Sequence, residues 1–150
     1  MAKAIPEGYR TITPQLSIDG AAKAIEFYTK AFGAEVKDRA VDPSGKKVWH
    51  ASLKIGDSMI FVNDVFPDMG GTESSSSIWL YVSDCDSAFE RAVSAGAKPT
   101  MPVADMFWGD RMGQVLDPFG QKWTITTHVK DMTPDEIKAA EKAFIDEMKK

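Results

Sequence analysis

The sequence consists of two similar halves, offset by 64 residues. The strand-like segment Leu16-Ser17-Ile18 corresponds to Leu80-Tyr81-Val82, and the Gly turn and strand at 56–61 correspond to those at 120–125. An internal repeat has to be considered before any motif, because it decides the fold. Two copies are too few for a solenoid. We therefore predict two equivalent modules packed into one domain, with a functional cleft built from both.

Composition narrows the class of protein. The 150 residues suit one domain, and 43% hydrophobic residues suffice for a core. The net charge of -4 is spread without a basic stripe, so we expect no nucleic-acid partner. The single Cys85 excludes an internal disulfide, and we expect it to be buried. No apolar run approaches the ~18 residues of a membrane span, and the N-terminus lacks a signal-peptide core, so we expect no membrane partner and a cytoplasmic protein.

Periodicity assigns the elements of the first half. Alternating residues predict a strand at 11–18, and apolar residues at helical spacing predict a helix over 21–32 that ends at Gly33. The remaining strands of this half are predicted at 35–41, 47–55 and 58–63.

The second half repeats this order, which makes the chain an α+β protein of two β-α-β-β-β modules. We expect the modules to form a curved mixed sheet with a cleft. Module one spans about 9–65, a Gly- and Ser-rich surface linker 66–76, and module two 77–128. The elements of module two are predicted at 78–83 (strand), 85–95 (helix), 98–103, 111–116 and 121–127 (strands).

A separate C-terminal helix is predicted over 133–149. Thr133, Pro134 and Glu136 occupy the N-cap, N1 and N3 positions of a capping box. One face of this helix is apolar, so it should dock on its own chain or on a second subunit. The apolar positions are Ile137, Ala140, Phe144 and Met148.

The two-module order and two local motifs resemble the vicinal oxygen chelate superfamily, which includes glyoxalase I, bleomycin-resistance proteins and extradiol dioxygenases. Ala24-Ile25-Glu26-Phe27-Tyr28 is similar to the first helix of that family, and Asp117-Pro118-Phe119-Gly120 to its turn before the last strand. The resemblance covers roughly residues 9–132. It implies the fold more than an activity, and it implies a homodimer.

Three further segments resemble the PhnB-like branch of this superfamily. They are Trp49 to Asp57, Phe107-Trp108-Gly109-Asp110-Arg111, and Trp123 to His128.

The resemblance also places the metal ligands. Metal-dependent members carry His, Gln or Glu early in the first strand of each module, and Glu on the last strand. Those positions fall at Thr13, Ile60, Ser77 and Thr124, none of which suits Ni²⁺, Zn²⁺ or Fe²⁺. Gln15 lies on the same strand face as Thr13 and would restore one ligand after a register slip. We therefore expect no metal and no other cofactor.

The remaining polar and aromatic residues define a candidate ligand site without a metal. Trp108 and Arg111 are able to stack on and pair with a planar or anionic molecule, although Asp110 is an equally good structural partner for Arg111. Trp79 and Tyr81 share one strand face, which the resemblance places along the cleft. Their rings either line a ligand pocket there or pack in the core. The sequence has two histidines. His50 is either a hydrogen-bonded core or cleft residue or a functional one, and His128 is expected to hydrogen-bond the start of the C-terminal segment.

The sequence thus leaves three functional hypotheses open. The first is a metal-independent protein that binds a small organic molecule in a mainly apolar cleft through Gln15, His50, Trp79, Tyr81, Trp108 and Arg111. The second is a metal-dependent lyase or dioxygenase of the glyoxalase type, with a non-standard site around Gln15, His50 or His128. The third is a non-catalytic protein that dimerises or binds a partner. No Ser-His-Asp spacing, P-loop or dinucleotide motif is present, and no catalytic residue is assigned.

Overall fold

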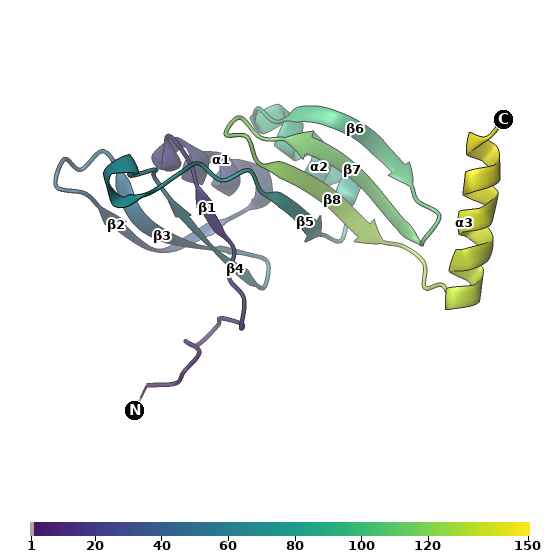
Figure 1. Cartoon of the computed structure of the whole chain (residues 1–150), viewed down its shortest axis with the longest axis horizontal. Coiled ribbons are helices and arrows are strands. Elements are labelled where there is room, and N and C mark those ends of the chain that lie inside the picture. Colours follow the sequence, from purple (N-terminus) through teal and green to yellow (C-terminus); the bar gives the residue numbers. More distant parts are fainter. Residues whose placement is uncertain (1) are drawn as a thin grey trace.

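The computed structural model describes residues 2–150 and contains two βαβββ modules in succession (Figure 1). In the first module, β1 runs parallel to β4 while β2 and β4 run antiparallel to β3, so the sheet is mixed and has the order β1-β4-β3-β2. Its elements are β1 (Gln15–Ser17), α1 (Ala21–Phe32), β2 (Glu35–Val41), β3 (Val48–Ile55) and β4 (Ser58–Asn63).

The second module has the same topology, with strand order β5-β8-β7-β6. The predicted α+β class and the two β-α-β-β-β modules are confirmed, and hydrogen bonding divides the eight strands into two four-stranded sheets. We call them the first and the second sheet. The elements of the second module are β5 (Ser77–Tyr81), α2 (Cys85–Ala95), β6 (Lys98–Asp105), β7 (Asp110–Leu116) and β8 (Lys122–His128).

The first strand is shorter than the alternating pattern predicted. Only Gln15–Ser17 pairs with β4, and residues 2–14 form an arm that leaves the body (Figure 1). Pro14 has no N–H to donate to the ladder and accepts one bond from Phe61 N. Ile12, which the alternation placed in the strand, is 81% exposed on this arm.

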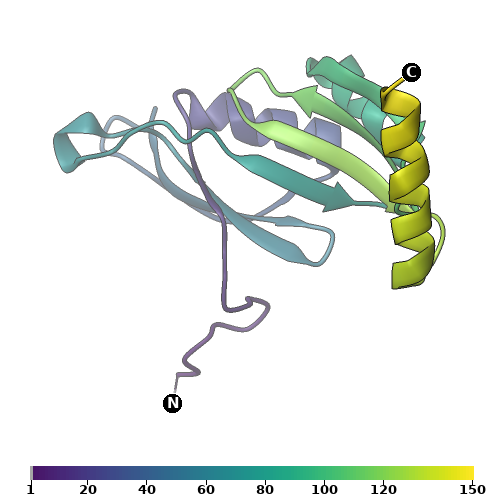
Figure 2. The same ribbon diagram turned by 45° about the vertical axis from the view of Figure 1, so that its right-hand side comes forward.

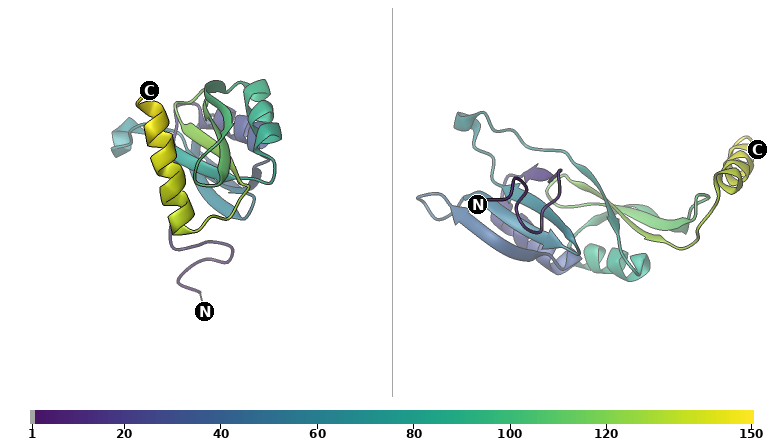
Figure 3. Two further views of the ribbon diagram at one scale, coloured as in Figure 1. Left: turned by 90° about the vertical axis from the view of Figure 1, so that its right-hand side faces the viewer. Right: turned by 90° about the horizontal axis from the view of Figure 1, so that it is seen from below.

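Helices α1 and α2 lie side by side on the same side of the two sheets (Figure 3). The residues of α1 at helical spacing are buried, and Gly33 ends the helix in the left-handed conformation with φ 68°. Leu16, Tyr28, Leu53 and Trp123 are among the largest fully buried side chains. The core therefore lies between the helices and the sheets, and each sheet keeps its other face open.

A buried carboxylate joins the modules. Asp117 Oδ2 accepts bonds from Tyr28 Oη at 2.6 Å and from Trp123 Nε1 at 2.9 Å. Asp117 Oδ1 accepts from the backbone N–H groups of Phe119 and Gln121. Burial, reinforced by this charge, raises the pKa of Tyr28 far above its usual value, so its hydroxyl stays a donor. The predicted Asp-Pro-Phe-Gly turn is thus tied to α1 of the other module.

The linker between the modules runs over the surface and contains a short 3-10 helix, η1 (Pro67–Met69). Its last part is fixed to both modules. Ser74 Oγ accepts a bond from Ser17 N of the first module, and Ser76 N donates to the buried Gln121 of the second.

The C-terminal helix α3 (Pro134–Met148) stands apart from both sheets (Figures 1 and 2). The predicted capping box is present, because Glu136 N donates to Thr133 Oγ1 and Thr133 N donates to Glu136 Oε1. No residue of α3 is buried, and its aromatic contact with the body is Phe144 against Phe107 at 5.2 Å between ring centroids. In residues 2–150, no helix combines the length and the apolar character that crossing a membrane requires.

We expect Phe27→Ala to lower the free energy of unfolding by about 3–5 kcal/mol, because it leaves a cavity under α1. Phe27 is 6% exposed and packs edge-on against Tyr28, Phe32 and Phe119. Phe119→Ala should cost less, because Phe119 is only partly buried. Urea unfolding of both variants measures the difference. An unfolding midpoint for Phe27→Ala equal to that of the unmodified chain would contradict this packing.

Candidate functional site

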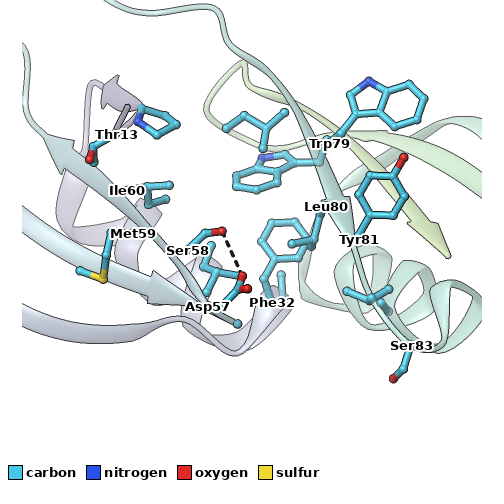
Figure 4. Close-up of a pocket in the computed structure, with 18 of the residues that line it drawn as sticks. Thr13, Phe32, Asp57, Ser58, Met59, Ile60, Trp79, Leu80, Tyr81 and Ser83 are labelled. Carbon is cyan, nitrogen blue, oxygen red and sulfur yellow. Dashed lines mark hydrogen bonds between the residues drawn. The ribbon is translucent and has the colours of Figure 1, made fainter. Parts of the chain in front are cut away.

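The open face of the second sheet, which is the face turned away from α2, carries two exposed aromatic rings. The alternation of β5 directs Trp79 and Tyr81 to one side and Leu80 to the other (Figure 4). Trp79 is 46% exposed and Tyr81 is 61% exposed. Their ring centroids lie 6.4 Å apart, so the two rings form one aromatic surface.

Polar side chains of the neighbouring strands lie beside these rings. Thr124 and Thr126 of β8 pair with Trp79 and Tyr81, and Gln114 Nε2 donates to Thr124 Oγ1 at 3.2 Å. Thr126 Oγ1 is buried and makes no hydrogen bond with any residue in 2–150. A buried hydroxyl without a partner costs stability.

A pocket of about 930 Å³ lies between the two modules. Trp79 and Tyr81 are among its lining residues, although their rings point away from Phe32 and Ile60 on the other side of β5 (Figure 4). Its wall is mainly apolar and includes Phe32 of α1, Ile60 of β4 and Leu80 of β5. The charged side chains around it have both signs. They are Arg10, Asp57, Asp84 and Arg91.

A second pocket, of about 470 Å³, lies on the open face of the first sheet. His50 lies here with its ring 4.7 Å from that of Phe61, and its Nε2 is 3.1 Å from Ser52 Oγ. Tyr9 of the N-terminal arm packs against Phe61 and forms part of this wall. Gln15 lies on the same sheet and donates to Asn63 Oδ1 at 2.8 Å.

Asp110 is the centre of a polar cluster at the end of the second sheet. This carboxylate, which is 4% exposed, accepts from Tyr81 Oη at 3.1 Å and from Trp108 Nε1 at 3.0 Å. It also lies 2.8 Å from His128 Nδ1, while His128 Nε2 lies 2.7 Å from Asp131. The prediction that His128 bonds the start of the tail is therefore confirmed.

The bonds of this cluster set its protonation. Burial by itself raises the pKa of Asp110, but the bonds from His128, Trp108 and Tyr81 outweigh it, and the pKa lies below its usual value. The bonds to Asp110 and Asp131 raise the pKa of His128. Both shifts favour the charged pair, so the cluster acts as an ion pair that fixes Tyr81 and Trp108 in place.

Arg111 lies on the opposite side of the second sheet. Its Nε and Nη2 donate to the two carboxylate oxygens of Asp86 on α2, at 2.7 and 2.9 Å, and Nη1 donates to Asp105 at 3.2 Å. The structural partners are therefore Asp86 and Asp105 rather than the neighbouring Asp110. Asp110 and Arg111 are adjacent residues of β7, so their side chains point to opposite faces of the sheet.

The structure thus brings together only part of the predicted site. Trp79 and Tyr81 share the large pocket, and Trp108 is joined to Tyr81 through Asp110. Gln15 and His50 lie on the first sheet, and Arg111 lies beside α2. Sequence reasoning missed Thr126 and Phe32, although the alternation of β8 already placed Thr126 on the same face as Thr124.

Comparison with known proteins identifies the family. The model of the Glyoxalase/Bleomycin resistance protein/Dioxygenase superfamily matches residues 12–125. The uncharacterized protein Mb0911c of Mycobacterium bovis is 41% identical over 138 residues, which are 86% of this chain and 90% of that protein. The chain belongs to this glyoxalase/bleomycin resistance superfamily.

Solved structures of other proteins have the same fold. TioX from Micromonospora sp. ML1 superposes with a TM-score of 0.67 at 26% identity, over 80% of this chain and 99% of TioX. The PhnB protein from Bacillus cereus superposes with a TM-score of 0.64 at 20% identity, over 79% of this chain and 99% of that protein, so it has the same fold.

The residues that the resemblance places at metal positions do not suit a transition metal. Ile60 has no donor atom, and Thr124 already accepts a bond from Gln114. Thr13 and Ser77 offer neutral hydroxyls, which are poor ligands for Ni²⁺, Zn²⁺ and Fe²⁺. In residues 2–150, no three side chains of His, Cys, Asp or Glu converge into a site that could hold a metal ion.

The raised pKa of His128 predicts a pH-dependent stability. Because the pKa of His128 is higher in the folded than in the unfolded protein, His128 stabilises the fold fully at pH values below its unfolded pKa of about 6.5. This stabilisation is lost as the pH rises through the folded pKa. The pKa of Asp110 is lowered in the folded protein, so Asp110 stabilises the fold fully until the pH falls below about 4.

The Tm difference between the unmodified chain and His128→Gln should therefore be largest near about pH 5–6 and shrink toward about pH 9. His50→Gln, which removes the other histidine, is the matched control. Thermal melts across this pH range measure both variants. A constant difference for His128→Gln at all pH values would show that the pair with Asp110 contributes through packing alone.

Proposed function

We propose that this superfamily member binds a small planar aromatic compound at Trp79 and Tyr81 without a metal. The observation that carries the proposal is the pair of adjacent, half-exposed rings at the edge of a largely apolar pocket of about 930 Å³. Pockets of roughly 300–1,000 Å³ with apolar walls and few polar groups are typical of small-molecule sites.

The physical argument is the cost of leaving these rings in water. Exposed Trp and Tyr faces gain free energy when another ring covers them, through apolar burial and offset stacking. The Tyr81 ring is held in place because its hydroxyl donates to Asp110, and the Trp79 ring lies against it, with 6.4 Å between the ring centroids. A ligand that stacks there loses little free energy to ordering the protein.

Polar groups beside the rings supply selectivity. Gln114, which is half-buried beside the rings and reaches Thr124, would donate a hydrogen bond to a ring with hydroxyl or carbonyl substituents. Arg111 is committed to Asp86 and Asp105, so we do not assign it an anion. We therefore assign binding to ring stacking and hydrogen bonding rather than to one strong charge.

This proposal is preferred over glyoxalase-type chemistry. The metal positions hold non-ligands, and both nitrogens of His128 lie on carboxylates, so neither is available as a general base. His50 lies on the other sheet, in the smaller pocket.

We expect Trp79→Ala to weaken the binding of 1,4-dihydroxyanthraquinone, a neutral planar probe, at least tenfold, because stacking on the indole is lost. The matched control is Trp49→Ala, since Trp49 is 43% exposed on the first sheet, away from the pocket. Isothermal titration of the unmodified chain and both variants measures this. Equal affinities of the two variants, or no binding to the unmodified chain, would overturn the proposed site.

We also expect dialysis against EDTA to leave the affinity for this probe unchanged, because the proposed contacts involve no metal. The same titration before and after dialysis, together with elemental analysis of the protein, is the measurement. A loss of binding that Ni²⁺, Zn²⁺ or Fe²⁺ restores would instead support the metal-dependent hypothesis.

A further inference from the structure

The hydroxyl of Tyr81 has its only proton committed to Asp110. Tyr81 Oη donates to Asp110 Oδ2 at 3.1 Å. An ionised carboxylate has no proton to donate, so the proton in this bond belongs to Tyr81. A phenol hydroxyl has one proton and also accepts hydrogen bonds through its lone pairs. Toward any further group, Tyr81 Oη therefore acts as an acceptor and not as a donor.

Asp110 stays ionised because its other neighbours are donors. Trp108 Nε1, which can only donate, lies 3.0 Å from Asp110 Oδ2. His128 Nδ1 lies 2.8 Å from Asp110 Oδ1, and His128 Nε2 lies 2.7 Å from Asp131 Oδ1, so an imidazolium donates to both carboxylates. The lowered pKa of Asp110 and the raised pKa of His128 are consistent with this charged pair. A protonated Asp110, which could donate to Tyr81, is disfavoured at neutral pH.

The backbone turn that carries Asp110 is fixed as well. Met106 N donates to Asp110 O at 2.7 Å, and Lys130 N donates to Gly109 O at 3.0 Å. Gly109 has a φ of 97°, and a Cβ there would lie 2.2 Å from Lys130 O, so only glycine allows this close approach. The carboxylate therefore keeps its position beside Tyr81 when a ligand binds, and the donor and acceptor roles are set in advance.

The accepting oxygen belongs to the aromatic surface of the candidate site. Tyr81 is exposed, and its ring centroid lies 6.4 Å from that of Trp79. Both rings lie on the same side of β5 (Figure 4). A fused two-ring compound that covers both rings would bring an edge substituent within reach of Tyr81 Oη. The chemistry of that substituent then decides whether the compound gains or loses a hydrogen bond.

The charges next to Tyr81 disfavour an anionic substituent. Asp110 and Asp131 carry two negative charges and the imidazolium of His128 carries one positive charge, which leaves a net charge of one negative unit in this cluster. Arg111, the guanidinium on the same strand, is paired with Asp86 and Asp105 on the other side of the sheet. A carboxylate placed at Tyr81 would therefore meet an acceptor oxygen and a negative charge.

We propose that the site at Trp79 and Tyr81 selects aromatic compounds that present a neutral O–H or N–H donor to Tyr81 Oη. An ether, carbonyl or carboxylate oxygen in the same place would set lone pairs against lone pairs, and both oxygens would lose their hydrogen bonds with water. A site built to hydrogen-bond one group strongly rejects analogues that lack it, which makes Tyr81 the residue that determines specificity. This inference rests on the proposed function, because it names the class of ligand for the same site.

The selectivity is tested with 2-naphthol and 2-methoxynaphthalene, which share one fused ring system and are both neutral at neutral pH. The methyl ether has more apolar surface, so apolar burial alone favours the ether. We expect 2-naphthol to bind the unmodified chain at least about fivefold more tightly, because it alone donates to Tyr81 Oη. The anionic analogue 2-naphthoate should bind more weakly than 2-naphthol. Isothermal titration measures all three affinities.

Tyr81→Phe isolates the hydroxyl, because it keeps the ring and removes the acceptor. The preference for 2-naphthol over its methyl ether should fall to within twofold, while the affinity for the ether stays within twofold of its value for the unmodified chain. The matched control is Tyr9→Phe, since the Tyr9 ring packs against Phe61 on the first sheet. This variant should keep the full preference. Thermal melts of both variants check that they fold.

The outcomes separate this inference from the proposed function. Equal affinities of the unmodified chain for 2-naphthol and its ether, or a preference that persists in Tyr81→Phe, would overturn the selectivity. If Trp79→Ala still weakened both compounds, stacking at Trp79 would stand. A 2-naphthoate affinity equal to that of 2-naphthol would also contradict the donor requirement. An unmodified chain that binds neither neutral compound would overturn the proposed function, and the selectivity with it.

Discussion

The buried carboxylate of Asp117 is the contact on which the arrangement of the two modules depends. It accepts four hydrogen bonds, of which Tyr28 supplies one from the first module. A buried charge is tolerated when its oxygens are fully bonded and is costly when a donor is lost. The turn before β8 is therefore locked against α1, and this contact fastens the second module to the first.

Buried aspartates recur wherever the fold fastens a loop. Asp64 accepts from the N–H groups of Gly20, Ala21 and Val48, and so ties the start of α1 to the end of β4. Asp110 uses the same chemistry at the edge of the molecule, but its donors are side chains that border the candidate site. The hydrogen bonds of Asp110 thus stabilise the fold and also hold Tyr81, Trp108 and the segment leading to α3 in place.

The two faces of each sheet have different roles. The faces toward α1 and α2 hold the core, with Leu53 and Ile125 fully buried. The open faces carry the features that suit binding: Trp79 and Tyr81 on the second sheet and His50 on the first. Because both modules are built alike, each contributes one such face, and binding specificity depends on which side chains the alternation of the strands directs there.

The sequence by itself determined the features that depend on neighbours along the chain. The bounds predicted for α1, β2, β4 and α2 agree with the structure, because local periodicity and Gly turns define them. The capping box of α3 and the non-ligand character of Thr13, Ile60, Ser77 and Thr124 were also readable from residue types alone. Pro14 shortened β1, since a missing N–H outweighs an alternating pattern.

Only the tertiary structure decided which side chains meet. Arg111 pairs with Asp86, 25 residues away, because β7 directs it toward α2, and no local pattern favoured that partner over the adjacent Asp110. The same holds for α3, whose apolar stripe predicted docking without showing on what. The backbone path after His128 carries α3 away from its own core. Local sequence sets the shape of each element, but packing between distant elements decides what each of its faces contacts.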